Sequence, residues 1–244
     1  MPLYNAGPFV KQSIQSVLDQ DYGNWTLLVA DDCSTDEGPH IVREMAKQDP
    51  RVLFIPSPFD HSTGAAATRN RALEKANGSL IAYLDSDDYW DPKFLSSQIA
   101  FMEAKKATFV CGAFYFLTEK GTTPFVPPEK VTYKDVLKTN TIQILTVLYD
   151  RDSLGVFNMP EQAVKREDLA CFLNILKKTQ YCFSNPEPLS YYRIHSGSVS
   201  SSKLKMIKYQ YRVYRRCEKI NPFKSLFLLW CWAVAGFKKH SKIK

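Results

Sequence analysis

Glycine-rich phosphate loops, paired cysteines and long apolar runs are missing from this sequence. Each absence argues against one class of protein or site. No glycine-rich phosphate loop with a basic residue stands near the N-terminus, which argues against a nucleotidyltransferase. The six cysteines are scattered without a Cys-x-x-Cys pair, a pattern typical of reduced thiols in a cytosolic protein and not of a zinc site. No signal-peptide pattern is visible. The apolar run from Ser225 to Phe237 has 13 residues, whereas a membrane-spanning helix needs about 20.

The composition is that of an ordinary folded protein, but its charge is unevenly distributed. The 244 residues are 45% apolar and 23% charged, enough for one large domain, or for one domain and an appendage. Residues 203–244 carry 12 Lys or Arg against the one acid Glu218, whereas residues 1–202 carry 20 basic and 24 acidic side chains. This basic tail is expected to meet an anionic partner. The body lacks the basic, aromatic face of a nucleic-acid reader, so no nucleic acid is expected.

One stretch organises the chain: a short apolar run that ends at Leu84 and is followed by Asp85, Asp87 and Asp88. Carboxylates repel one another and are costly to desolvate, so a buried strand that ends in this way needs a compensating cation. Oxygen ligands in an Asp-x-Asp arrangement suit Mg²⁺ or Mn²⁺. The alternative is that Asp88 or Asp91 caps the next helix while the other carboxylates are solvated.

Strand-like and helix-like segments alternate along the chain. The expected strands are 25–30, 52–55, 79–84, 108–116, 142–149 and 189–194; the expected helices are 8–21, 37–48, 64–76, 92–104, 133–138 and 166–177, with a proline-rich loop at 122–128. This alternation predicts an α/β fold with a mostly parallel sheet flanked by helices. Ligands bind at the carboxyl ends of the strands in such sheets. Asp31-Asp32 and the acidic stretch both follow strands, so they are expected at one edge.

The first residues, Met1 to Asn5, have the pattern of the end of a strand and the loop after it. We expect that the sequence starts a few residues late, at an internal Met, so that the N-terminal strand is truncated. The alternative is a short edge strand.

Six sequence blocks together resemble the family-2 glycosyltransferases, which have the GT-A fold of nucleotide-sugar transferases. The blocks are Pro2-Leu3-Tyr4-Asn5, Val29 to Asp36, Ala67-Thr68-Arg69-Asn70, Leu84 to Asp88, Glu167-Asp168 and Arg193-Ile194-His195. They occur in the family's order over about residues 1–200. Tyr149-Asp150-Arg151 and Met159-Pro160 resemble the subgroup that builds bacterial cell-surface polysaccharides, such as the teichuronic acid glycosyltransferases.

The resemblance implies a donor site for a nucleotide sugar, with UDP the expected nucleotide. Asp32 would accept a hydrogen bond from the uracil ring, and Asp31 would support it or the ribose. Arg69 would approach the nucleotide or diphosphate. The full set of donor-binding residues implied by the resemblance is Pro2, Tyr4, Asn5, Asp31, Asp32, Arg69, Asp85, Ser86, Arg193 and His195. The alternatives are helix capping for Asp31 and Asp32, and a solvated helix face for Arg69.

The resemblance also implies a divalent ion and an inverting mechanism. Asp87 and Asp85 would hold Mg²⁺ or Mn²⁺ on the diphosphate, with His195 reaching back to the same place. Asp88 would contact the sugar or cap a helix. Asp168 would be the general base that takes the proton of the acceptor hydroxyl, and Glu167 would orient the acceptor or the base. The alternative is that Glu167 and Asp168 only complement a helix N-terminus.

The chain departs from the family pattern at Cys33, which replaces the usual glycine of an Asp-Asp-Gly-Ser turn. That turn is therefore not expected to use a positive φ. Because of Cys33 and the short start, a catalytically impaired nucleotide-binding member stays open as an alternative function, as does a nucleotidyltransferase of similar fold.

The expected organisation is a GT-A domain over residues 1–202, with a nucleotide-binding half (1–90) and an acceptor-binding half (91–202), followed by a basic, partly apolar helical segment (203–244). Trp230 and Trp232 beside flanking lysines suit a helix that lies in a membrane interface; the alternative is a helix docked on the core. The predicted function is transfer of a sugar to a saccharide or lipid-linked acceptor in cell-surface polysaccharide biosynthesis. The expected location is cytoplasmic and peripheral on the inner face of the plasma membrane.

Overall fold

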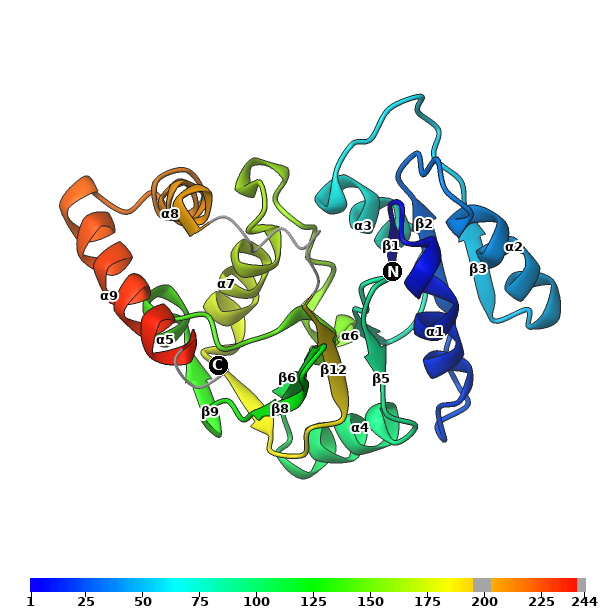
Figure 1. Cartoon of the computed structure of the whole chain (residues 1–244). Helices are drawn as coiled ribbons and strands as arrows, with labels where there is room; N and C mark the ends of the chain where they lie inside the picture. Colours follow the sequence, from blue (N-terminus) through cyan, green and yellow to red (C-terminus); the bar gives the residue numbers. More distant parts are fainter. Residues whose placement is uncertain (195–202, 241–244) are drawn as a thin grey trace.

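The computed structural model describes residues 1–194 and 203–240. Its first third is a three-stranded parallel sheet in the order β1-β2-β3, made of β1 (Pro2–Leu3), β2 (Leu27–Asp31) and β3 (Val52–Ile55). Helices α1 (Gly7–Leu18), α2 (Gly38–Gln48) and α3 (Ala65–Glu74) connect and follow these strands (Figure 1). The apolar run that predicts β2 is buried along most of its length because helices cover a parallel sheet on both faces.

The rest of the chain forms two further sheets. A five-stranded sheet has the order β4-β10-β6-β11-β9, and a four-stranded sheet has the order β5-β12-β7-β8. Their strands are β4 (Leu80–Ala82), β5 (Tyr89–Trp90), β6 (Phe109–Gly112), β7 (Phe114–Thr118), β8 (Gly121–Phe125), β9 (Lys130–Thr132), β10 (Leu148–Asp150), β11 (Tyr181–Asn185) and β12 (Ser190–Arg193). The α/β fold is confirmed. The expectation of a mostly parallel sheet holds only for the first sheet, because β10 runs antiparallel to both β4 and β6.

The remaining helices and helical turns lie between and after these strands. They are α4 (Phe94–Ala104), α5 (Tyr133–Lys138), η1 (Ile144–Thr146), α6 (Arg151–Leu154), η2 (Glu161–Ala163), α7 (Glu167–Thr179), α8 (Lys203–Arg212), η4 (Val213–Cys217) and α9 (Pro222–His240). Among the described residues, no helix combines the length and the apolar character needed to cross a membrane.

Three sequence predictions are wrong in the second half of the chain. The segment expected as a strand over 142–149 contains the helical turn η1, and only its last two residues belong to β10. The strand expected over 108–116 divides at Ala113 into β6 and β7, which belong to different sheets. The loop expected over 122–128 is partly the strand β8, in which Pro124 lies opposite Tyr115. Proline is tolerated there because β8 is the last strand of its sheet, so its missing N–H is not needed by another strand.

The basic C-terminal segment shares the main hydrophobic core. Val213, Tyr214 and Leu228 are buried in one cluster with α7 residues, and the Tyr214 hydroxyl donates to the Leu137 carbonyl oxygen over 2.6 Å. Helix α9 packs against α5 and α8 at the edge of the molecule opposite α2 and β3 (Figure 1). The described part of the tail is therefore docked on the body, as the alternative prediction stated.

A cavity of about 300 Å³ separates the first two sheets. Its lining includes Leu27 and Leu28 of β2, residues 80–84 of β4 and the turn after it, and Met1 and Arg69. β1 and β4 are edge strands of separate sheets. The first residues were expected to be the end of a truncated strand, with a short edge strand as the alternative; Pro2 and Leu3 form a two-residue edge strand that pairs in parallel with Ala30 and Asp31.

Candidate active site

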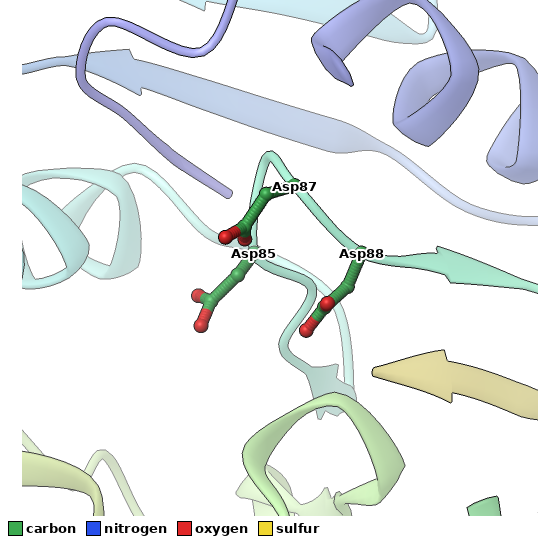
Figure 2. Close-up of side chains that lie close together, drawn as sticks. All are labelled: Asp85, Asp87 and Asp88. Atoms are coloured by element: carbon green, nitrogen blue, oxygen red, sulfur yellow. The ribbon is translucent and has the colours of Figure 1, made fainter. Parts of the chain in front are cut away.

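Three carboxylates converge in the turn that joins β4 to β5. One oxygen from each of Asp85, Asp87 and Asp88 lies within 4.8 Å of the others, and Figure 2 shows the three side chains close together on this turn. The Asp88 N–H donates to the Asp85 carbonyl oxygen over 3.2 Å and closes the turn. The helix-cap alternative does not hold for Asp88, since the turn leads into β5 and helix α4 begins later at Phe94. Asp91 does accept the Lys93 N–H on its Oδ1 over 3.0 Å, just before that helix.

Asp88 is the buried member of the cluster. Its side chain is 1% exposed, and its Oδ1 accepts the Arg193 backbone N–H over 2.8 Å, while Oδ2 has no hydrogen-bond partner within the described ranges. Burial, and then the charges of Asp87 and Asp85, raise the pKa of Asp88 well above its ordinary value, against the opposing effect of Arg193. A buried acceptor without a donor, beside two further carboxylates, fits a hard divalent cation of the Mg²⁺ or Mn²⁺ type.

Arg69 joins this acidic turn to the start of α7. Its side chain is 8% exposed; Nη2 lies 2.6 Å from Asp85 Oδ1, and Nη1 lies 3.3 Å from Glu167 Oε1. Burial alone would lower the pKa of the guanidinium, but Asp85 and Glu167 raise it above the ordinary value. The alternative of a solvated helix face is therefore wrong. Arg69 is a charged crosslink between the acidic turn and the start of α7, and it lies 98 residues from Glu167 in the sequence.

Glu167 and Asp168 occupy the first turn of α7, as the sequence predicts. Burial raises the pKa of Glu167, and the positive charge of Arg69 partly offsets this rise. Asp168 is half-buried, and its charge also acts on Arg69. Arg166, just before the helix, stacks on Trp232 of α9 with its guanidinium carbon 5.2 Å from the ring centre. Glu167 and Asp168 therefore lie beside the buried Arg69 and the half-buried Arg166 at the start of α7.

Asp32 has a different environment at the end of β2. Its Oδ1 accepts from the Thr63 N–H and hydroxyl over 2.7 and 2.9 Å, and its Oδ2 accepts from the Ser62 hydroxyl and the Gly64 N–H over 2.6 and 2.9 Å. Burial would raise the pKa of Asp32, but these hydrogen bonds outweigh it and lower the pKa. The carboxylate thus fixes the loop that leads into α3. A carboxylate offers about four acceptor positions, so all of them are occupied.

The turn after Asp32 is tied to the N-terminal loop. Asn5 donates its N–H to the Ser34 hydroxyl over 3.1 Å, and its side-chain oxygen accepts the Thr35 N–H over 2.8 Å. Cys33 has φ 62°. The expectation that this turn avoids a positive φ is wrong, because the surrounding hydrogen bonds hold a non-glycine residue in the left-handed region.

Comparison with known proteins identifies the chain. Residues 1–155 match the model of the family described as "Glycosyl transferase family 2". The chain belongs to this family. It is 37% identical over 242 residues to TuaG of Bacillus subtilis, a glycosyltransferase that its description places in teichuronic acid biosynthesis; the match covers 98% of this chain and 95% of TuaG. It is 38% identical over 243 residues to the Escherichia coli glucosyltransferase WfgD, covering 99% of this chain and 93% of WfgD.

Solved structures confirm the GT-A fold of this family-2 chain. Staphylococcus aureus TarS in complex with UDP-GlcNAc superposes with a TM-score of 0.68 at 19% identity, over 93% of this chain and 68% of TarS. The mannosyltransferase PcManGT of Pyrobaculum calidifontis, in complex with GDP-Man and Mn²⁺, superposes with a TM-score of 0.68 at 17% identity, over 94% of this chain and 66% of PcManGT. The predicted family and fold are confirmed.

The predicted site residues of this family-2 glycosyltransferase fall into two groups. The first group is one network around the acidic turn: Arg69, Asp85, Asp87, Glu167 and Arg193, together with Asp88. Asp168 lies next to it. The second group lies where β1 and β2 end: Pro2, Tyr4, Asn5, Asp31 and Asp32.

Two predicted residues stand apart, and two further residues escaped the sequence analysis. Ser86 is buried and contributes its carbonyl oxygen to the Ser13 hydroxyl over 2.9 Å. His195 lies outside the described residues. Arg71 donates to the Asp31 carbonyl oxygen over 2.5 Å, and Gln12 accepts from Arg193 over 2.7 Å. Arg71 follows Arg69 by two positions, but nothing in the sequence marks Gln12.

Proposed function

We propose that this family-2 glycosyltransferase is an inverting, metal-dependent enzyme. It moves a sugar from a UDP-sugar to a hydroxyl of a saccharide or lipid-linked acceptor in cell-surface polysaccharide biosynthesis. The observation that carries the proposal is the convergence of the acidic turn, Arg69 and the start of α7. The printed names of relatives support the substrates. WfgD is named as a UDP-Glc:alpha-D-GlcNAc-diphosphoundecaprenol beta-1,3-glucosyltransferase, and TarS is seen with UDP-GlcNAc.

Asp87 and Asp85 would hold the divalent ion, with His195 as a further proposed ligand. When bound, the ion neutralises negative charge on the diphosphate as a Lewis acid. Asp85 already pairs with Arg69 over 2.6 Å, so the Arg holds this carboxylate in place beside the site. Asp88 Oδ1 would keep its hydrogen bond from the Arg193 backbone N–H, and Asp88 Oδ2, unpaired in the described part of the chain, would complete the acidic surroundings of the ion.

The proposed nucleotide site lies over the ends of β1 and β2. Pro2, Tyr4, Asn5 and Asp31 would line it, and Tyr4 is 55% exposed and so accessible to a base or ribose. We still propose that Asp32 accepts a hydrogen bond from the uracil ring, on one condition. Because four donors occupy its oxygens, the uracil N–H has to replace one of the two hydroxyl donors.

Asp168 is the proposed general base. Its carboxylate makes no hydrogen bond within the described ranges, whereas the neighbouring Glu167 is paired with Arg69. The acceptor oxygen forms a bond to the anomeric carbon while the bond from that carbon to the diphosphate breaks with its electron pair. Asp168 takes the hydroxyl proton as the new bond forms. Attack from the face opposite the diphosphate inverts the anomeric centre. Glu167 would orient the acceptor or the base.

We also propose the division into a nucleotide-binding half (1–90), an acceptor-binding half (91–202) and a basic segment (203–244). Strands β4 and β5 of the first half pair with β10 and β12 of the second, so the two halves share sheets. A cytoplasmic place, peripheral on the inner face of the plasma membrane, follows from the proposed lipid-linked acceptor and from contact through residues 225–237.

The test is a screen of UDP-sugars that measures UDP release with a polyprenyl-diphosphate saccharide as acceptor and Mn²⁺ present. Asp168→Asn should lower transfer by about 10²–10⁴-fold and leave UDP binding in calorimetry unchanged. Asp87→Asn should weaken the Mn²⁺-dependent part of UDP binding. Asp152→Asn, an exposed aspartate on α6, is the matched control and should match the wild type in both assays. Near-wild-type transfer by Asp168→Asn would show that the base is another residue.

A further inference from the structure

Helix α9 carries a row of large apolar side chains that face solvent. Phe223 is 86% exposed, Leu226 and Phe227 are each 56% exposed, and Trp230 is 64% exposed. Their spacing of three, four and seven residues places them on one face of the helix. The opposite face is the docked one, since Ser225 and Leu228 are buried. We call Phe223, Leu226, Phe227, Trp230 and the 37%-exposed Val234 the α9 face.

The two tryptophans of α9 have different surroundings. Trp230 projects from the α9 face, with its ring centre 6.3 Å from that of Phe227. Trp232 packs inward over the guanidinium of Arg166. The sequence predicts a membrane interface for both side chains; the structure leaves Trp230 exposed for such a contact and gives Trp232 a partner within the protein.

Within the described part of the segment that carries the α9 face, the exposed charged side chains are basic. Lys208, Arg216, Lys219 and Lys224 are exposed. The single acid between residues 203 and 240, Glu218, has a side chain only 1% exposed and pairs with Lys177 over 2.8 Å. A second copy of this face would bring like charges together, whereas an anionic surface would be attracted. Apolar area rimmed by lysine and arginine is the combination that binds the interface of an anionic bilayer.

We propose that the α9 face is a docking surface for membranes containing anionic phospholipid. Phe223, Leu226, Phe227 and Trp230 enter the boundary between headgroups and acyl chains, and the surrounding basic residues contact the phosphates. α9 lies parallel to the membrane plane in this arrangement. Its other face stays on α5 and α8 at the edge of the molecule (Figure 1).

The docking surface connects to the candidate active site through one contact. Trp232 stacks on Arg166, and Arg166 immediately precedes Glu167 and Asp168. A membrane under α9 therefore holds the start of α7 close to the lipid surface. This part of the inference rests on the proposed function, because it matters only if the acceptor is attached to a lipid.

The experiment is flotation of the full chain with phosphatidylcholine vesicles, with and without phosphatidylglycerol. The wild type should float with the anionic vesicles and much less with the neutral ones. Phe227→Ser combined with Trp230→Ser should lower the partition coefficient about 100-fold, since each substitution removes one large apolar side chain. Lys219→Gln combined with Lys224→Gln should lower it about 25-fold on anionic vesicles only.

Matched controls separate docking from damage to the fold. Leu53→Ser combined with Val126→Ser removes two exposed apolar side chains elsewhere and should float like the wild type. The wild-type tryptophan emission should shift to the blue on anionic vesicles; this shift should persist in Trp232→Phe and disappear in the Phe227→Ser, Trp230→Ser variant. Unchanged circular dichroism and melting temperature of that variant show that the fold is intact.

Three results would overturn the inference: a wild type that does not float, a Phe227→Ser, Trp230→Ser variant that floats like the wild type, or a wild-type dimer that this variant converts to a monomer without any vesicle binding. The last result would show that the α9 face binds a second copy of this chain and not a membrane. Asp87→Asn separates the two proposals, because it should float normally while inactive. Failure of the proposed transfer therefore leaves the flotation result standing, and failure of flotation leaves the transfer assay standing.

Discussion

Removal of the Arg69 charge should destabilise this protein more than removal of any surface arginine. Arg69→Met keeps most of the side-chain volume but leaves Asp85 and Glu167 without their cation, beside Asp87 and Asp88. At an effective dielectric constant of 20, each ion pair at about 4 Å is worth roughly 4 kcal/mol before desolvation. Breaking a buried pair by removing one partner lowers the free energy of unfolding by about 3–5 kcal/mol. We expect a loss in that range.

The assay is urea unfolding followed by circular dichroism, with and without Mn²⁺. The ion should stabilise Arg69→Met more than the wild type, because it then meets an acidic cluster with no internal cation. Arg43→Met is the matched control, since Arg43 is exposed and lies over the Phe54 ring; it should lose less than about 1 kcal/mol. If the free energy of unfolding of Arg69→Met lay within about 1 kcal/mol of the wild-type value, Arg69 would not be a stabilising crosslink.

Two further predictions concern the turn after β2. The hydrogen bonds to Asp32 lower its pKa in the folded state. The ionised carboxylate therefore stabilises the fold above the unfolded-state pKa of about 3.9, and this contribution is lost as the pH falls through the folded-state pKa. Asp32→Asn should remove this acid dependence below about pH 4 in unfolding titrations. At Cys33, with φ 62°, Cys33→Val should lose about 1–3 kcal/mol in urea unfolding because a β-branched residue is strained there, whereas Cys33→Gly should stay within about 1 kcal/mol; equal losses would exclude backbone strain as the cause.

The sequence predicts those parts of the site that depend on strand ends. Asp32 and Asp85 follow short apolar runs of the length typical of buried strands, so both turns could be placed at the carboxyl ends of β2 and β4. Glu167 and Asp168 precede a clear helical period, and they do form the first turn of α7. Local patterns are sufficient in these cases because they determine both the element and its boundary.

Contacts between distant segments could not be predicted in this way. The pairing of Arg69 with Glu167 spans 98 residues, and no local pattern distinguishes an arginine that faces solvent from one that bridges two acids. The insertion of β10 between β4 and β6 depends on the packing of whole sheets. The φ of Cys33 is imposed by neighbouring hydrogen bonds, which override the preference of the residue itself.

The hollow between β2 and β4 has a mechanical consequence for the acidic turn. No strand ladder joins β1 to β4 among the described residues, so main-chain hydrogen bonds do not resist sliding across this seam. Side-chain packing, the Arg69 guanidinium and hydrogen bonds from α1 to the acidic turn, such as that from the Ser13 hydroxyl to the Ser86 carbonyl oxygen, do so instead, around about 300 Å³ of space. Because pressure favours states with less internal void volume, we expect it to displace β1 relative to β4 before it affects pairs of hydrogen-bonded strands. The spacing of the carboxylates is thereby coupled to how fully that space is filled.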